Sequence, residues 1–130
     1  MMGVPTFYTR LLANEKLNNE SAKHMRLFIS GSAPLLSETH IEFEKRTGKK
    51  ILERYGMTET NMNISNPYDG LRKAGTVGIP LPGIEIRIVN EEGKEVEEDQ
   101  IGTIELKGEN IFKGYWGMEE KTKELSLIHI

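Results

Sequence analysis

The order of strand and helix signals in the first half of the chain limits its fold most. Strand-like stretches cover residues 25–29 and 50–54, and between them Ser37 and Gly48 suit the beginning and the end of a helix. A strand, a helix and a second strand in this order favour two parallel strands joined by a crossover helix. The first half therefore predicts an α/β fold with a β-α-β unit.

Signals outside this unit extend the prediction. Pro5 suits the first turn of a helix whose apolar residues Phe7, Leu11 and Leu12 share one side, with Tyr8 nearby, and the helix after Ser37 carries Ile41, Phe43 and Lys45. Residues 18–21 are polar and predict a turn. Strand signals then dominate from residue 75 onward.

In that later part, apolar and charged residues alternate with a period of two. Ile84, Ile86 and Ile88 alternate with charged residues, and Ile104 and Leu106 repeat the pattern within 102–108. The two segments predict antiparallel partners in a small β-meander. We therefore predict an α/β portion over 1–74 and a β-rich portion over 75–124.

Composition excludes several classes of protein. The chain has no cysteine, which excludes a disulfide framework, a thiolate metal site and a cysteine nucleophile. A net charge of −3 with mixed signs gives no reason to expect nucleic-acid binding. No apolar run has membrane-spanning length, and no signal-peptide pattern opens the chain. We expect a soluble intracellular protein, most simply a cytoplasmic one.

Small and polar residues follow both strands of the predicted β-α-β unit. Ser30, Ser32, Ala33 and Pro34 follow the first strand, and the segment from Tyr55 to Glu59 follows the second. Ligands of α/β folds bind at the carboxyl ends of the strands. A threonine hydroxyl can donate to a phosphate, and a glutamate can bind Mg²⁺. Each segment alone also fits an ordinary tight turn, but the pair favours a nucleotide crevice.

The same residues carry a family resemblance. The segment Glu53-Arg54-Tyr55-Gly56-Met57-Thr58-Glu59-Thr60, together with 75–83, 102–108 and 114–116, resembles the adenylate-forming, AMP-binding superfamily of acyl-CoA synthetases. Residues 3–10, 53–63 and 65–70 are most similar to the malonyl-CoA synthetases. The resemblance implies that residues 1–124 are part of the large N-terminal domain of such an enzyme.

The resemblance also implies an activity. Its members are AMP-forming acid–thiol ligases, which use ATP and Mg²⁺ to convert a carboxylic acid to an acyl-adenylate and then transfer the acyl group to coenzyme A. The implied acid is malonate or methylmalonate, in fatty acid metabolism, and the implied partners are these small molecules alone. Two alternatives stay open: a ligase for an aryl or medium-chain acid, and a nucleotide-binding module without catalysis.

The resemblance assigns roles to individual residues. Tyr55 is expected to stack on adenine, Thr58 to contact the α-phosphate and Glu59 to hold Mg²⁺. Arg10 is expected to bind the free carboxylate of malonate, assisted by Ser30 or Ser32, because the planar guanidinium matches a carboxylate. Glu53 or its backbone is expected to meet the exocyclic amine of adenine. The implied nucleotide site comprises Ser32, Ala33, Pro34, Glu53, Arg54, Tyr55, Gly56, Met57 and Thr58.

Several segments of the superfamily have no counterpart in the chain. They are the upstream phosphate-binding loop with its lysine, the downstream aspartate for the ribose, and the mobile C-terminal domain. The resemblance therefore predicts an internal fragment that is inactive alone. Residues 125–130 match the translated end sequence of a transposase sequencing adapter, which predicts a non-native tail; the alternative is a short apolar strand.

Overall fold

The computed structural model describes residues 1–126. The chain divides into two compact units, the first formed by Met1–Met57 and Met62–Ile79, the second by Thr58–Asn61 and the chain from Pro80 onward. Within the described residues, no helix combines the length and the apolar character needed to cross a membrane.

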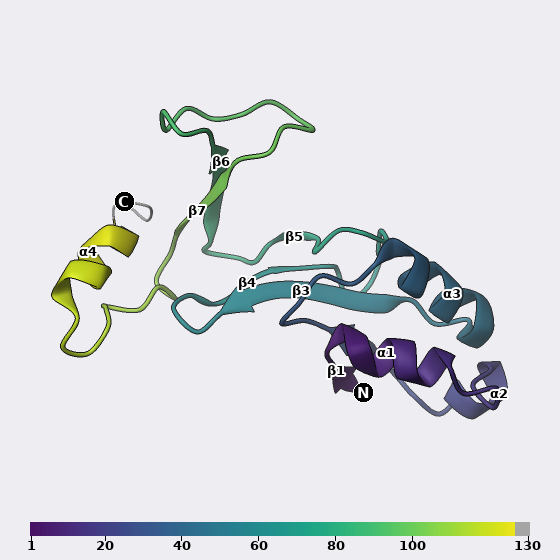
Figure 1. The fold of residues 1–130 in the computed structure, drawn as a ribbon. Helices are drawn as coiled ribbons and strands as arrows, with labels where there is room; N and C mark the ends of the chain where they lie inside the picture. The colour runs from purple at the N-terminus through teal and green to yellow at the C-terminus, as the bar shows by residue number, and fades with distance from the viewer. Residues whose placement is uncertain (127–130) are drawn as a thin grey trace. The chain divides into compact units, whose positions relative to one another are not determined.

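A mixed sheet organises the first part of the chain (Figure 1). Its strands lie in the order β1-β2-β3-β4-β5, and β2 is parallel to both β1 and β3, with Ile29 opposite Met2 and Leu52. The elements are β1 (Met2–Gly3), α1 (Pro5–Leu12), α2 (Asn19–Ala22), β2 (Phe28–Ser30), α3 (Ser37–Thr47), β3 (Ile51–Met57), β4 (Asn61–Ser65) and β5 (Ile79–Pro80). The predicted α/β class and the parallel β2-α3-β3 unit are confirmed.

Aromatic side chains form the centre of this unit. The ring of Phe43 on α3 packs edge-on against Tyr8 and Phe28, with centroids 5.3 and 4.9 Å apart. The Tyr8 hydroxyl donates to the carbonyl of Ile29 at 2.6 Å, which satisfies the buried phenol. Phe7, which the sequence placed on the apolar side of its helix, is instead 48% exposed. Ile41 on α3 is 57% exposed.

Some helix boundaries differ from the prediction. Residues 18–21 are not a turn, because the Asn18 side chain accepts from the Ser21 amide and begins α2 with a capping box. Ser37 is the first residue of α3 rather than its N-cap, which is Leu36. Gly48 ends α3 in the left-handed region with φ 67°, as predicted.

Strand boundaries also differ. β2 begins at Phe28 rather than at residue 25, and β3 continues to Met57, so that Tyr55 and Gly56 belong to the strand and not to a loop. A turn over residues 58–60 then leads into β4. A connection this short joins antiparallel strands, since parallel strands need a long crossover. The sequence did not predict β4, because asparagine is disfavoured in strands.

Gly78 lies where the backbone leaves no room for a side chain. Its φ is +99°, and an added Cβ would lie 2.2 Å from the carbonyl oxygen of Ser65. Gly78→Ala is therefore expected to destabilise the fold by about 2–4 kcal/mol, through backbone strain and overpacking together. Thermal unfolding measures this. Gly83→Ala is the control, because Gly83 also has positive φ but no atom within 4 Å of its added Cβ; an equal loss in both variants would contradict the steric explanation.

The second unit contains a two-stranded antiparallel ribbon and a helix. β6 (Glu85–Val89) pairs with β7 (Thr103–Lys107), with Ile86 opposite Leu106 and Ile88 opposite Ile104. The predicted antiparallel pairing is confirmed. The helix α4 (Glu119–Ser126) was not predicted, and it shows that a strand beginning at residue 125 is wrong for residues 125 and 126. The rest of the predicted tail, 127–130, lies outside the described residues.

Candidate functional site

A hollow of about 330 Å³ lies in the first unit, beyond the carboxyl end of β2 and beside the second half of β3. This is the position at which α/β sheets bind ligands. Three segments of the unit supply its walls. The lining residues are Ser32, Ala33, Pro34, Leu35, Glu53, Arg54, Tyr55, Gly56, Gly75, Thr76 and Val77.

The first wall is the loop between β2 and α3. Leu35 is buried and anchors the loop to the core, whereas Ser32, Ala33 and Pro34 are exposed. Ser32 has φ 68°, a left-handed conformation that is uncommon for a residue with a side chain. The loop therefore presents small side chains, which allow a flat ligand to approach its backbone.

The second wall is the end of β3. Glu53 and Tyr55 are two residues apart in the strand, so their side chains point to the same face of the sheet. Tyr55 is half-buried, and its hydroxyl lies 3.7 Å from the sulfur of Met57. A partly exposed ring beside small residues suits stacking on a planar heterocycle.

The third wall, residues 75–77, was not predicted as part of a site. Buried Asn66 ties it to β3: the Asn66 amide donates to the carbonyl of Glu53 at 2.9 Å, and its side chain donates to the carbonyl of Thr76 at 2.7 Å. A sequence signal was present in the glycine-rich segment that begins at Gly75. Asn66 gave none, because an isolated asparagine is typical of any turn.

Glu53 connects the walls through its carboxylate. The side chain is buried, lies 3.5 Å from Nδ1 of His40 on α3, and accepts hydrogen bonds from the amides of Leu35 and Gly75. Burial raises the pKa of Glu53, and the contact with His40 and the two amides oppose that rise. The carboxylate thus holds the first and third walls together, and the contact of Glu53 or its backbone with the adenine amine stays a prediction.

Glu53→Gln is expected to loosen the hollow. A glutamine replaces one carboxylate oxygen by an NH2 donor and removes the negative charge that the amides of Leu35 and Gly75 face, at a cost of about 1–3 kcal/mol. The variant should unfold at a lower temperature and bind ATP more weakly. Glu15→Gln, at an exposed position, is the matched control. Unchanged unfolding and ATP affinity in Glu53→Gln would contradict this account.

Thr58 and Glu59 follow β3 directly in the chain and belong to the second unit. Thr58 is exposed in the turn over 58–60. One carboxylate oxygen of Glu59 accepts a hydrogen bond from the hydroxyl of Tyr115 at 2.6 Å. This bond lowers the pKa of Glu59, so the carboxylate is ionised at neutral pH.

An ionised glutamate at this position fits a magnesium ion that is shared with a nucleotide. Mg²⁺ is commonly bound by one or two carboxylates together with substrate phosphates, and not by a cage of protein ligands. Among residues 1–126, no group of three or more His, Cys, Asp or Glu side chains has the arrangement of such a cage. A single carboxylate such as that of Glu59 fits a magnesium ion whose other ligands are supplied mainly by the nucleotide.

The predicted carboxylate-binding residues lie outside the lining of the hollow. Arg10 is exposed in the last turn of α1 and makes no hydrogen bond or ion pair within the described part of the chain. Ser30, the last residue of β2, is buried, and its hydroxyl has no hydrogen-bond partner among these same residues. The Arg10 guanidinium is thus accessible to a ligand, whereas the Ser30 hydroxyl is enclosed.

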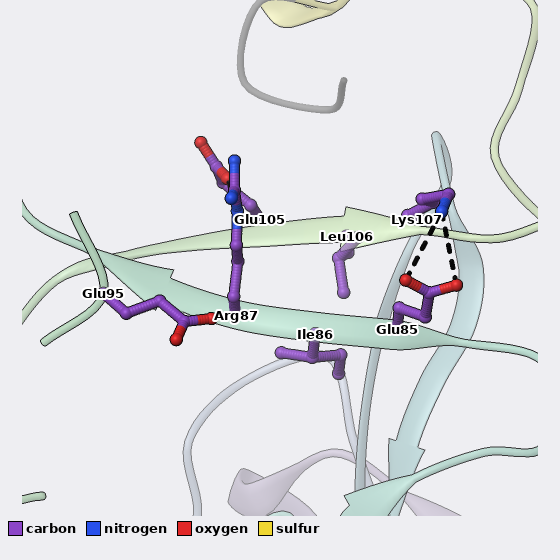
Figure 2. Close-up of a pocket in the computed structure, with 7 residues that line it drawn as sticks. All are labelled: Glu85, Ile86, Arg87, Glu95, Glu105, Leu106 and Lys107. Atoms are coloured by element: carbon purple, nitrogen blue, oxygen red, sulfur yellow. Dashed lines mark hydrogen bonds and ion pairs between the residues drawn. The ribbon is translucent and has the colours of Figure 1, made fainter. Parts of the chain in front are cut away.

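A second hollow, in the ribbon of the other unit, does not carry chemistry (Figure 2). Four of its charged side chains pair across the two strands: Lys107 lies 3.4 Å from Glu85, and Arg87 bonds to Glu105. The register places each pair directly opposite, as cross-strand stabilisation requires. These charges compensate one another, so the first hollow is the candidate site.

The fold agrees with comparisons to known proteins. The AMP-binding enzyme family matches residues 1–116, and the chain belongs to this family. This confirms the predicted superfamily and its α/β fold class.

Several relatives are ligases. The chain is 44% identical over 130 residues to a malonate–CoA ligase of Arabidopsis thaliana, covering 94% of this chain and 21% of that protein. It is 34% identical to the mitochondrial malonate–CoA ligase ACSF3 of Mus musculus, covering 94% and 26%. The chain thus spans between a fifth and about a quarter of the length of these relatives.

Solved structures give the same result. ATP-bound MatB from Rhodopseudomonas palustris is 63% identical, with a TM-score of 0.91 over 95% of this chain and 25% of that one. A malonyl-CoA ligase in a ternary product complex with methylmalonyl-CoA and AMP is 40% identical, with a TM-score of 0.82 over 95% and 27%.

Proposed function

We propose that this chain is a segment of a longer, AMP-forming acid–CoA ligase that activates malonate or methylmalonate. The observation that carries the proposal is the hollow at the end of β2 and β3, whose walls are tied together by Glu53 and Asn66. The malonate–CoA ligases among the relatives, at 34–44% identity, support the choice of acid.

The proposed reaction has two steps. A carboxylate oxygen of the acid attacks the α-phosphorus of ATP; a P–O bond forms, the bond to pyrophosphate breaks, and an acyl-adenylate results. The thiol of coenzyme A then attacks the acyl carbon, loses its proton, and releases AMP as the thioester forms. Both steps depend on holding the reacting atoms close together.

The residues of the hollow are assigned to the nucleotide. Tyr55 stacks on the adenine, and the small residues Ser32, Ala33 and Pro34 lie along the base. Glu53 joins the first and third walls, while Arg54, Gly56 and Met57 complete the strand end that follows the nucleotide. Together these contacts orient the α-phosphate towards the acid.

Thr58 and Glu59 are assigned to the phosphates. The hydroxyl of Thr58 donates to the α-phosphate, whose charge increases in the transition state. Glu59 is the protein ligand for Mg²⁺. When bound, the ion neutralises phosphate charge. The ionised state of Glu59 suits this role.

Arg10 and Ser30 are assigned to the second carboxylate of malonate. Arg10 has no partner among residues 1–126, and the hydroxyl of Ser30 is buried without one. A guanidinium binds a carboxylate with two parallel hydrogen bonds, which a monocarboxylic acid does not need. This pair is therefore the proposed basis for choosing malonate.

A different acid is the second candidate. The chain is 32% identical to a long-chain-fatty-acid–CoA ligase of Yersinia pestis and 31% identical to a benzoate–CoA ligase of Burkholderia xenovorans, the latter with a TM-score of 0.85. A nucleotide-binding module without catalysis is the third. A cytoplasmic location and the absence of nucleic-acid partners stay predictions.

The test uses the complete protein that contains this chain. Where its gene is not at hand, this segment replaces the equivalent segment of Rhodopseudomonas palustris MatB, with which it is 63% identical. Formation of the CoA thioester and of AMP is measured with malonate, methylmalonate, acetate, benzoate and octanoate. Malonate or methylmalonate should give the highest kcat/KM.

The other outcomes separate the alternatives. A preference for benzoate or octanoate would keep the ligase and overturn the choice of acid. ATP binding without AMP formation on any acid would favour the module without catalysis.

A further inference from the structure

The turn that carries Glu59 is held by a segment far along the chain. The amide of Phe112 donates to the carbonyl of Glu59 at 2.7 Å, and the side chain of Asn110 donates to the carbonyl of Thr60. All of these residues belong to the second unit. The backbone carbonyls of Glu59 and of the next residue are therefore held by residues 110–112.

A residue shortly after this segment also holds the Glu59 side chain. The hydroxyl of Tyr115 donates to the carboxylate at 2.6 Å, across a separation of 56 residues. A hydrogen bond of an O–H donor to a carboxylate is charge-assisted and is stronger than one between neutral groups. The backbone of Glu59 is thus held by Phe112, and its side chain is held by Tyr115.

Tyr115 is itself held in place. Its ring packs edge-on against Phe112 with centroids 4.9 Å apart, and its amide donates to the hydroxyl of Thr122 at 2.9 Å. That hydroxyl donates to the carbonyl of Met118, also at 2.9 Å. These two contacts fix the ring and the backbone of Tyr115 independently of Glu59. The phenol is therefore preorganised for its hydrogen bond with the carboxylate.

We propose that Tyr115 is a positioning residue for Glu59: its hydroxyl holds the carboxylate in one rotamer for a divalent cation that arrives with the nucleotide. The inference rests on the proposed function, because it assumes that Glu59 binds that cation. Groups that orient a metal ligand typically change metal affinity by about 10–100-fold when they are removed.

The test is Tyr115→Phe in the complete protein, because phenylalanine keeps the ring against Phe112 and removes only the hydroxyl. The affinity for Mn²⁺ in the presence of a non-hydrolysable ATP analogue is measured by electron paramagnetic resonance. We expect the dissociation constant of Mn²⁺ to rise about 10-fold, with the affinity for metal-free nucleotide unchanged. Tyr68→Phe, at an exposed tyrosine, should change neither.

Glu59→Gln distinguishes a failure of the Tyr115 inference from a failure of the proposed metal-binding role of Glu59. If Glu59→Gln weakens Mn²⁺ binding and Tyr115→Phe does not, the inference is overturned and the proposed function stands. If neither variant weakens it, the metal-binding role of Glu59 fails, and the inference fails with it. Loss in both variants, with unchanged thermal unfolding of Tyr115→Phe, supports both.

Discussion

Arg10→Ala is expected to lower kcat/KM for malonate by about 100- to 1,000-fold in the complete ligase. Truncating one partner of a charged, hydrogen-bonded pair in a site costs several kcal/mol, and each 1.36 kcal/mol is a tenfold change in rate. Arg10 is an exposed cation with no partner within residues 1–126. Its removal should therefore affect the bound acid and leave the fold unchanged.

The controls separate binding of the second carboxylate from general damage. Arg10→Lys keeps the charge but loses the planar fork, so its effect should lie between those of the unsubstituted protein and Arg10→Ala. Residual activity on acetate should be unchanged in both variants. Equal loss on malonate and acetate, or loss on neither, would remove Arg10 from the acid site.

Glu59→Gln is expected to lower kcat by at least about 100-fold. The change keeps the size of the side chain and removes its charge, and a neutral amide is a poor ligand for Mg²⁺, which prefers charged oxygen donors. Losing one preorganised group that stabilises transition-state charge commonly costs this much. The measurement is steady-state thioester formation at saturating ATP over a range of Mg²⁺ concentrations.

Another glutamate provides the matched control. Glu109 is exposed and directly precedes residues 110–112, which hold the Glu59 turn. Glu109→Gln therefore removes the same charge and leaves the proposed metal ligand in place. Its activity should stay within a factor of about 2, as expected for a surface substitution. A kcat for Glu59→Gln equal to that of Glu109→Gln would exclude a catalytic role for Glu59.

Local signals explain which parts of the fold were predictable. Gly48 ended α3 because a glycine reaches the left-handed region without strain. The alternation through Ile86 and Ile88 predicted the strand β6, and its partner β7 showed the same period. In each case the determining residues are neighbours along the chain, so their order carries the information.

The tertiary structure decided which side of a helix was buried. Phe7 and Tyr8 are adjacent and both aromatic, yet Tyr8 is fully buried and Phe7 is 48% exposed. The carbonyl of Ile29, 21 residues away, accepts a hydrogen bond from the Tyr8 hydroxyl. This bond offsets the free-energy cost of removing the hydroxyl from water. Apolar periodicity within the helix contains no information about that distant acceptor.

The candidate site divides in the same way. The amino-acid sequence was enough to predict the family. It also showed that a small-residue loop precedes the Tyr55–Glu59 segment along the chain and that both contain residue types suited to a nucleotide. Only the tertiary structure decided that Glu53 joins the amides of Leu35 and Gly75, and that Tyr115 holds Glu59. Residues 56 positions apart meet because strand pairing and turns bring their segments together, and a pairwise contact of this kind leaves no local pattern in either segment.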